Sequence, residues 1–223
     1  MTVHRFLVAG TDTGVGKTEV ACALAALLAE RQERPWVFKP YESGMEQSNV
    51  PADAQALRQA AGNWQSLDTV CLYRYRAPLS PAVAAKLERR PASFRRVLRT
   101  LHQAEGASMV VEGAGGLLSP LDGQHTIADI AQALRLPVLL VARNALGTLN
   151  HTALCLEALR HRRIKVAAVL LSQSAAQADI SQKTNHRWLS QTFTNVTFLP
   201  PMPFIDAHQK RLTALKRVLS RLM

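Results

Sequence analysis

The sequence of 223 residues predicts an α/β fold with a doubly wound, mostly parallel sheet and helices on both faces. Short apolar runs rich in valine and leucine alternate with longer segments whose apolar residues recur at helical spacing. The apolar runs lack polar alternation, which indicates strands covered on both faces. Strands that alternate with helices are joined by right-handed crossovers and form parallel sheets. The length fits one domain, and we expect it to span residues 1–223.

In the first half of the chain, residues 5–10 (RFLVAG) form an apolar run that ends in glycine, which predicts a strand. Residues 17–33 carry Val20, Leu24 and Leu28 at helical spacing and predict the first helix. PWVFKP and SMVVE predict strands at residues 35–40 and 108–112. Further helices are expected at residues 52–61, 81–88 and 92–105.

The second half continues the alternation of strands and helices. PVLLVA, VAAVLL and a short apolar run predict strands at residues 137–142, 166–171 and 196–199. Helices are expected at residues 126–136, 147–161, 178–192 and 207–222. Ligands of such sheets bind at the carboxyl ends of the strands, and every glycine motif of this chain follows a strand end.

The composition excludes several classes of protein. Apolar residues make up 48% and charged residues 19% of the chain, which excludes disorder. No apolar run reaches the roughly 18 residues of a membrane span. Residues 1–9 run directly into a glycine-rich loop and predict a strand rather than a signal peptide. Cys22, Cys71 and Cys155 lack metal-ligand spacing, and Cys22 and Cys155 lie in helical apolar patterns typical of core thiols, which favours a cytoplasmic, reducing location.

The net charge of +11 favours binding of polyanions. The basic residues, however, form three tracts, each of which is typical of the solvated face or end of a helix: residues 89–99, 160–165 and 210–221. No tract is interleaved with aromatic residues, which make up only 5% of the chain. The pattern therefore argues against nucleic-acid binding.

GTDTGVGKT (residues 10–18) follows a predicted strand and opens a predicted helix, which is the context of a phosphate-binding loop. Its glycines let backbone N–H groups converge on phosphate oxygens, and the helix N-terminus adds positive potential. Lys17 reaches the β- and γ-phosphates in such loops, and the Thr18 hydroxyl is a Mg²⁺ ligand. Thr11 stands where the strict pattern has glycine, so the loop is a longer variant that starts at Gly10. The loop makes the fold similar to that of P-loop NTPases.

Three further motifs follow other strand ends. KPYESG brings Lys39 and Ser43 to the end of the second strand, and VEGAGG brings Glu112 to the end of the third. A carboxylate beside a phosphate loop suits Mg²⁺ coordination or the positioning of water. GTLNH (residues 147–151) opens a helix, which suits a carboxylate or a phosphate. Asp53, taken alone, is typical of an acid in the first turn of a helix.

GTDTGVGKT, KPYESG, VEGAGG and GTLNH occur in this order within residues 10–151. The set resembles the dethiobiotin synthetases, and the resemblance extends from Phe6 to about Leu171. It implies a ligase that uses ATP, Mg²⁺, CO₂ and 7,8-diaminopelargonic acid. The diamine captures CO₂ as a carbamate, ATP phosphorylates the carbamate, and the second amine closes the cyclic urea. The family also implies a homodimer.

The resemblance implies the residues that bind the nucleotide and the metal. Lys17 holds the ATP phosphates, supported by the backbone of the loop. The nucleotide-binding set is Thr13, Gly14, Val15, Gly16, Lys17, Thr18, Glu112, Gly115 and Ser172. The Mg²⁺ ligands are Thr18, Asp53 and Glu112. At Asp53 the resemblance thus replaces the structural interpretation with a functional one.

The resemblance also implies the residues of the reaction. Lys39 touches the carbamate and the γ-phosphate, Ser43 touches the carbamate or an amine, and Thr13 faces the carbamate. The implied catalytic set is Lys17, Lys39, Thr13 and Ser43. Ser80 and Pro81 lie near the diamine. Gly147, Thr148, Leu149 and Asn150 receive the substrate carboxylate across the dimer interface, which makes the site composite.

The chain departs from the family pattern at three places. Many members have an acidic residue in place of Gly14. The asparagine that reads adenine is replaced by Ser172 and Gln173, which leaves the nucleotide preference open. The pair Tyr41 and Glu42 is larger than the family's residues and reshapes the edge of the pocket.

Two alternatives stay open from the sequence. A partition-type P-loop ATPase would bind DNA through the basic surface, although such proteins carry a second lysine where this chain has Gly10 and Thr11. A weakened paralogue of the synthetase would keep the fold and the dimer, which Gly14 and the residues at 172–173 suggest.

Overall fold

The computed structural model describes residues 3–45, 50–173, 176 and 179–223. Five strands form a sheet in the order β2-β5-β1-β6-β7, and every neighbouring pair is parallel. The strands are β1 (Arg5–Gly10), β2 (Trp36–Phe38), β5 (Met109–Glu112), β6 (Val138–Arg143) and β7 (Val166–Ser172). The predicted fold class is confirmed.

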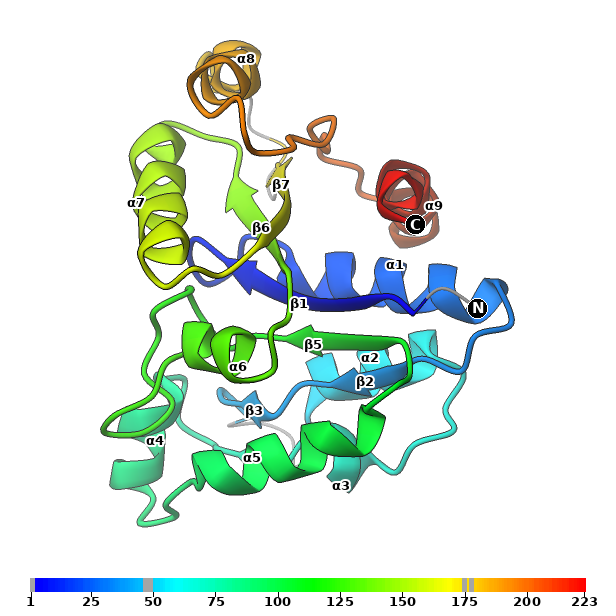
Figure 1. The fold of residues 1–223 in the computed structure, drawn as a ribbon, viewed down its shortest axis with the longest axis vertical. Coiled ribbons are helices and arrows are strands. Elements are labelled where there is room, and N and C mark those ends of the chain that lie inside the picture. The colour runs from blue at the N-terminus through cyan, green and yellow to red at the C-terminus, as the bar shows by residue number, and fades with distance from the viewer. Residues whose placement is uncertain (1–2, 46–49, 174–175, 177–178) are drawn as a thin grey trace.

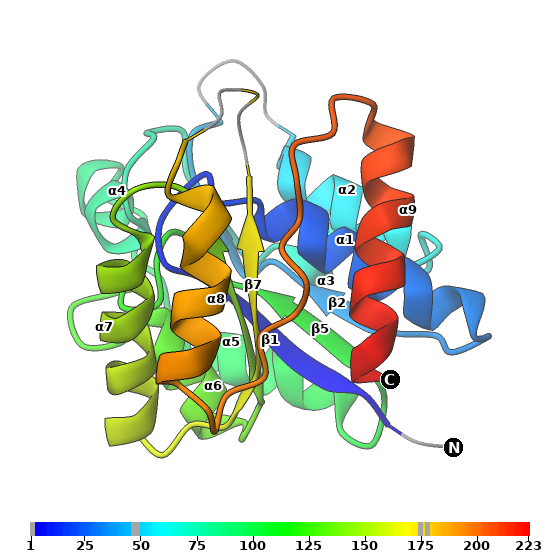
Figure 2. The same cartoon turned by 90° about the horizontal axis from the view of Figure 1, so that it is seen from above.

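Helices cover both faces of the sheet (Figures 1 and 2). One face carries α1 (Lys17–Glu30), α2 (Ala52–Ala60) and α9 (His208–Leu219). The other carries α4 (Pro81–Leu87), α5 (Phe94–Leu101), α6 (Ile127–Ala133), α7 (Thr148–His161) and α8 (Gln182–Thr192). Short elements complete the order: α3 (Leu67–Val70), the strands β3 (Tyr41–Glu42) and β4 (Tyr73–Arg74), and the 3-10 turns His102–Ala104 and Ser220–Leu222.

The central strand β1 explains why the sheet has two cores. Its side chains alternate between the faces, so that Leu7 joins the core under α6 and α7 while Val8 joins the core under α1 and α9. Both side chains are fully buried. Burial of such a side chain contributes about 1.5–3 kcal/mol to stability. This anchored strand delivers the following loop to the carboxyl edge of the sheet.

The expected strand at residues 196–199 does not form. Phe198 in this segment makes a single bridge with Val169, and Met202 beyond the segment makes one with Ser172. Pro200, Pro201 and Pro203 follow the segment, and a proline cannot donate to a ladder. Among the other expected elements, the helix at 178–192 begins at Gln182, and Ala178 lies outside the described residues. The small β3–β4 sheet and α3 were not expected, because their runs are only two to four residues long.

The cysteines differ in part from expectation. All three are free, and Cys71 is buried whereas Cys22 and Cys155, expected in the core, are only partly buried. Burial raises the pKa of Cys22 and Cys71 to about 12 and that of Cys155 to about 11, so the thiols stay protonated at neutral pH. Within the described residues, no helix has the length and apolar character needed to cross a membrane.

The start of α6 is held by Asp129, and its loss gives a first prediction. One oxygen of Asp129 accepts from the backbone N–H of Thr126 at 2.6 Å and from its hydroxyl at 2.7 Å, and the other accepts from Arg162 at 2.7 Å. Partial burial opposes ionisation, but these hydrogen bonds lower the pKa of Asp129 below its ordinary value of 3.8. We expect Asp129→Ala to lower the free energy of unfolding by about 1–2 kcal/mol in urea titrations at pH 7.

The pH dependence of that loss follows from the lowered pKa. The stabilisation by Asp129 is present at neutral pH and disappears as the pH falls through the lowered pKa, so the difference between variant and wild type narrows in acid. Asp68→Ala is the control, because Asp68 pairs with Arg74 at 2.6 Å but its side chain is 87% exposed. Equal losses in the two variants would contradict the assigned role of Asp129.

Candidate active site

The loop between β1 and α1 has the geometry of a phosphate cradle. Gly16 adopts a left-handed backbone with φ 96° and precedes Lys17, the first residue of α1. A side chain at Gly10 would place its Cβ 2.8 Å from the Asp12 carbonyl oxygen and 3.0 Å from Lys17 Cδ. The side chain of Lys17 therefore packs directly against Gly10, the last residue of β1. This close approach explains why the longer loop needs glycine at position 10.

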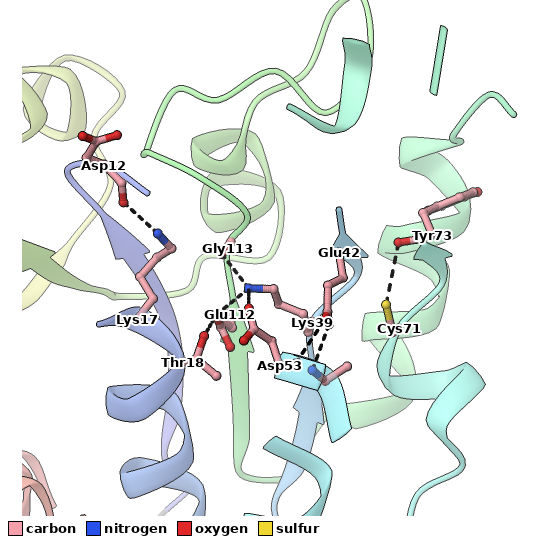
Figure 3. A network of polar contacts seen from close by, with 11 residues as sticks. Asp12, Lys17, Thr18, Lys39, Glu42, Asp53, Cys71, Tyr73, Glu112 and Gly113 are labelled. Carbon is pink, nitrogen blue, oxygen red and sulfur yellow. Dashed lines mark hydrogen bonds and ion pairs between the residues drawn. The ribbon is translucent and has the colours of Figure 1, made fainter. Parts of the chain in front are cut away.

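Lys17 is 6% exposed, and its ammonium donates to the carbonyl oxygen of Asp12 at 2.8 Å (Figure 3). Burial, together with the positive charge of Lys39, lowers the pKa of Lys17 to about 8. The positive charge of this ammonium, at the wall of the cavity, is thus only partly offset by the carbonyl oxygen of Asp12. An anion placed there would raise the pKa of Lys17 again and be stabilised by it.

Lys39 joins the two carboxylates at the ends of neighbouring elements (Figure 3). Its ammonium lies 2.5 Å from Glu112 Oε1 and 3.1 Å from Asp53 Oδ2. Burial alone would lower the pKa of Lys39, but the two carboxylates raise it above the ordinary value. The Thr18 hydroxyl donates to the same Glu112 oxygen at 2.7 Å. The structure therefore brings together Thr18, Lys39, Asp53 and Glu112, which the sequence had placed on four separate segments.

This cluster fits a divalent cation of the Mg²⁺ type. Oε2 of Glu112 is buried and has no hydrogen-bond partner within the part of the chain that the structure describes. Mg²⁺ takes oxygen ligands, and it usually keeps one or two carboxylates together with water and substrate phosphates. Two carboxylates and a hydroxyl match the sparse protein shell of Mg²⁺.

A cavity of about 570 Å³ opens over the loop. On one side of Lys17 its wall is formed by residues that follow β2 and β5; on the other side it is formed by the segment that leads into α9. Its lining residues are Thr13, Gly14, Gly16, Lys17, Thr18, Glu19, Lys39, Tyr41, Glu42, Ser43, Asp53, Glu112, Ala114, Gly115, Phe204, Ile205, Asp206, His208 and Arg211. Most of the sequence-derived nucleotide, metal and catalytic residues thus line one cavity.

Several sequence-derived residues lie outside the lining of this cavity. Val15 is fully buried in the core beneath the loop. Ser172 is buried at the end of β7, where its hydroxyl oxygen accepts a hydrogen bond from Arg211 at 3.1 Å. The Ser172 side chain is thus engaged within the protein, behind Gly16, where a Cβ would lie 3.2 Å from its hydroxyl.

The residues expected to bind the diamine begin two helices. Ser80 is the N-cap of α4, Pro81 is its first residue, and the loop before them contacts the KPYESG segment, where a Cβ at Gly44 would meet Pro78 at 3.6 Å. Gly147, with φ 93°, is the N-cap of α7. In the first turn of α7 the side chain of Thr148 is buried, Leu149 packs against the core and Asn150 is exposed. Neither helix start lines the cavity within the single chain.

Sequence reasoning missed Arg211, which completes the wall of the cavity. It lies in the basic tract that the sequence assigned to a solvated face, yet it is only 5% exposed. Its guanidinium donates to Glu19 at 2.7 Å, to Ser172 and to the carbonyl oxygen of Gln173 at 3.2 Å. Arg211 thereby ties α9 to α1 and to the end of β7. No periodicity distinguishes it from its solvated neighbours, because only the tertiary fold supplies its partner Glu19.

Comparisons with known proteins agree with this geometry. Residues 4–209 match the family model described as an AAA domain. A protein from Anaeromyxobacter dehalogenans (strain 2CP-C), the "ATP-dependent dethiobiotin synthetase BioD", is 43% identical over 96% of each chain. The protein of the same name from Bacillus velezensis is 33% identical over 92% of this chain and 88% of its own length.

A solved structure supports the fold alone. A putative plasmid partition protein from Borrelia burgdorferi B31, bound to AMPPNP, aligns over the whole of both chains with a TM-score of 0.57 and 10% identity. At that identity the likeness says nothing about the partners of the present chain.

The two relatives from Anaeromyxobacter dehalogenans and Bacillus velezensis, together with the phosphate loop and the cavity over it, establish that the chain belongs to the ATP-dependent dethiobiotin synthetases, ATP-binding ligases of biotin biosynthesis.

Proposed function

We propose that the chain carboxylates 7,8-diaminopelargonic acid with CO₂ and closes the ureido ring through a carbamic–phosphoric anhydride, with ATP and Mg²⁺. The observation that carries this proposal is the convergence of Lys17 and Lys39 in one cavity with Thr18, Asp53 and Glu112. Transfer of a phosphoryl group onto a carbamate brings two anions together. The site must therefore supply cations that offset their repulsion.

We assign the residues the following roles, which their positions support. Lys17 binds the phosphates, helped by the backbone N–H groups of residues 13–18. Lys39 lines the same cavity as Lys17 and Ser43, and there it contacts the carbamate and the transferred phosphoryl group. Thr18, Asp53 and Glu112 would hold Mg²⁺, which supplies charge neutralisation at the phosphates. Thr13 and Ser43, both at the wall of the cavity, provide hydroxyl groups for the carbamate.

We further propose that two copies of the chain form a homodimer with a composite site. Exposed apolar side chains gather near the start of α7, with Leu146 85%, Ile180 86% and Leu154 60% exposed. The backbone N–H of Leu146 donates to Asp179, which brings the loop before α7 close to Ile180. Such a patch favours an interface. Gly147–Asn150 begin the same helix and would face the cavity of the partner copy.

We expect Leu146→Asp to shift the chain toward monomer in sedimentation velocity and to raise the KM for the diamine. A charge in an apolar interface loses its hydration without gaining a partner. Val3→Asp is the control, because Val3 is 45% exposed and lies just before β1, which begins on the opposite side of the molecule from α7 (Figures 1 and 2). An unchanged association state, or a monomer with unchanged KM, would contradict the composite site.

The decisive test measures phosphate release from MgATP in bicarbonate buffer, with and without 7,8-diaminopelargonic acid, together with the formation of dethiobiotin. The proposal expects release that depends on the diamine. Release that does not need the diamine and is enhanced by DNA would instead favour a partition-type ATPase. No release under either condition would favour a weakened paralogue.

A further inference from the structure

We propose that Glu42 is a positioning residue that fixes the start of α2 and, through it, the carboxylate of Asp53 opposite Lys39. Glu42 lies in β3, whereas Asp53 lies in the first turn of α2. The inference rests on the proposed roles of Asp53 and Lys39 in the reaction. It gives Glu42 a role beyond the reshaped edge of the pocket that the sequence suggested.

The contacts of Glu42 are directed at the helix rather than at the cavity. Its Oε1 accepts from the backbone N–H of Asp53 at 3.0 Å, and its Oε2 accepts from the backbone N–H of Ala54 at 2.9 Å. Both oxygens of a carboxylate that is only 7% exposed are thus engaged by consecutive N–H groups of one helix turn (Figure 3). Charge-assisted hydrogen bonds of this kind are stronger than neutral ones.

The start of α2 needs such an acceptor. The first N–H groups of a helix have no partners within the helix. The N-cap of α2 is Pro51, which makes no side-chain cap hydrogen bond. Glu42 provides the missing acceptor from a different element, and its negative charge at the N-terminus of α2 is favoured by the helix dipole.

Asp53 depends on this anchor, because among the described residues only Lys39 pairs with its carboxylate. Its side chain is 45% exposed, and its carboxylate meets Lys39 at 3.1 Å. The side chain is therefore not fixed by packing, and its place is set by the backbone of the first turn. Glu42 is separated from Lys39 only by Pro40 and Tyr41, so the same carboxylate links the segment carrying Lys39 to the helix carrying Asp53.

The test compares Glu42→Ala and Glu42→Gln with Glu88→Gln. Glu88 is a matched control because its Oε1 also accepts from two consecutive backbone N–H groups, those of Arg76 at 2.7 Å and Ala77 at 3.0 Å, but it does not line the cavity. Calorimetric titrations measure ATP affinity with and without Mg²⁺, in the absence of the diamine. Melting temperatures of each variant report on the fold, and steady-state kinetics give kcat and the KM for the diamine.

We expect Glu42→Ala to weaken the Mg²⁺-dependent part of ATP affinity about 10- to 100-fold, the usual effect of losing a residue that supports a metal ligand. Binding of ATP without Mg²⁺ and the KM for the diamine stay near the wild-type values. Glu42→Gln retains one acceptor of the same shape and recovers part of the loss. Glu88→Gln lowers the melting temperature without changing the Mg²⁺ dependence.

Two results would overturn the inference. A rise confined to the KM for the diamine would make Glu42 a substrate contact instead. A lowered melting temperature with unchanged Mg²⁺ dependence, as in Glu88→Gln, would make it merely structural. If the wild type itself bound ATP without any Mg²⁺ dependence, the proposed metal role of Asp53 would fail, which the wild-type titration reveals independently of the variants.

Discussion

We expect kcat/KM for ATP to fall by at least about 10²–10³-fold in the Lys17→Ala variant, because removal of one preorganised donor to the reacting group has an effect of this size. Lys17 is buried at the floor of the cavity, and among the described residues its ammonium donates only to the carbonyl oxygen of Asp12. No other lysine lies at the start of α1 to replace it. Initial rates of phosphate release measure the loss, and Lys86→Ala, at an exposed lysine of α4, is the control.

The lowered pKa of Lys17 adds two consequences with opposite signs. Because burial lowers this pKa to about 8, the wild-type kcat/KM should fall as the pH rises above about 8 and the ammonium of the free enzyme loses its proton. The same shift means that charged Lys17 destabilises the fold at pH 7, and this cost disappears as the pH rises from about 8 through the ordinary value of 10.5. We therefore expect Lys17→Met, although inactive, to have a free energy of unfolding that exceeds that of the wild type by on the order of 2–3 kcal/mol at pH 7 without nucleotide.

A Lys17→Met variant that is both inactive and less stable than the wild type would contradict this account of the buried charge. Retention of activity in Lys17→Ala would contradict the assignment of the phosphate site itself. Urea titrations at pH 7 and at pH 10 separate the stability effect from the kinetic one.

The second large effect is expected for Lys39→Ala, which should lower kcat by about 10²–10³-fold while ATP affinity changes little. Lys39 follows β2, whereas the phosphate loop follows β1, and its proposed partners are the carbamate and the charge that develops during transfer. Rapid-quench measurement of phosphoryl transfer and calorimetric ATP titration give the two quantities separately. Equal losses of kcat and of ATP affinity would contradict this role, and a loss of ATP affinity at unchanged kcat would show that Lys39 serves ground-state binding instead.

Removal of Lys39 also has a thermodynamic signature. It leaves Glu112, whose carboxylate is buried, without its ammonium partner at 2.5 Å, and breaking a buried pair costs about 3–5 kcal/mol. Since Mg²⁺ would then be the remaining cation for Glu112 and Asp53, we expect it to raise the melting temperature of Lys39→Ala more than that of the wild type. Lys39→Gln, which keeps a donor, is the substitute if the alanine variant does not fold. An equal response of wild type and variant to Mg²⁺ would contradict this shared use of the carboxylates.

The sequence predicted the part of the site that depends on strand ends. A parallel sheet brings the carboxyl ends of its strands to one edge, so the residues after β1, β2 and β5 had to meet once the fold class was correct. Lys17, Lys39 and Glu112 lie together for this reason. Their spacing along the chain is irrelevant, because each strand delivers its own motif.

The remainder depends on contacts that leave no local pattern. Arg211 and its basic neighbours look alike in sequence, and only the packing of α9 on α1 makes one of them buried. In the sequence Glu42 looks like an ordinary acidic residue beside a turn. It becomes a hydrogen-bond acceptor for the backbone of α2 only because the fold places the start of that helix beside it. The expected strand at 196–199 failed for a similar reason, since the apolar pattern was correct but prolines prevented a ladder.

The bond from Arg211 to Glu19 joins residues that are 192 positions apart. The ribosome therefore synthesises the phosphate loop long before it adds Arg211, which completes the wall of the cavity. During synthesis the loop and α1 are made before Arg211 can complete the wall of the cavity. A nascent chain that ends before α9 therefore lacks the complete cavity for a nucleotide. The complete cavity therefore requires translation of the chain at least as far as Arg211.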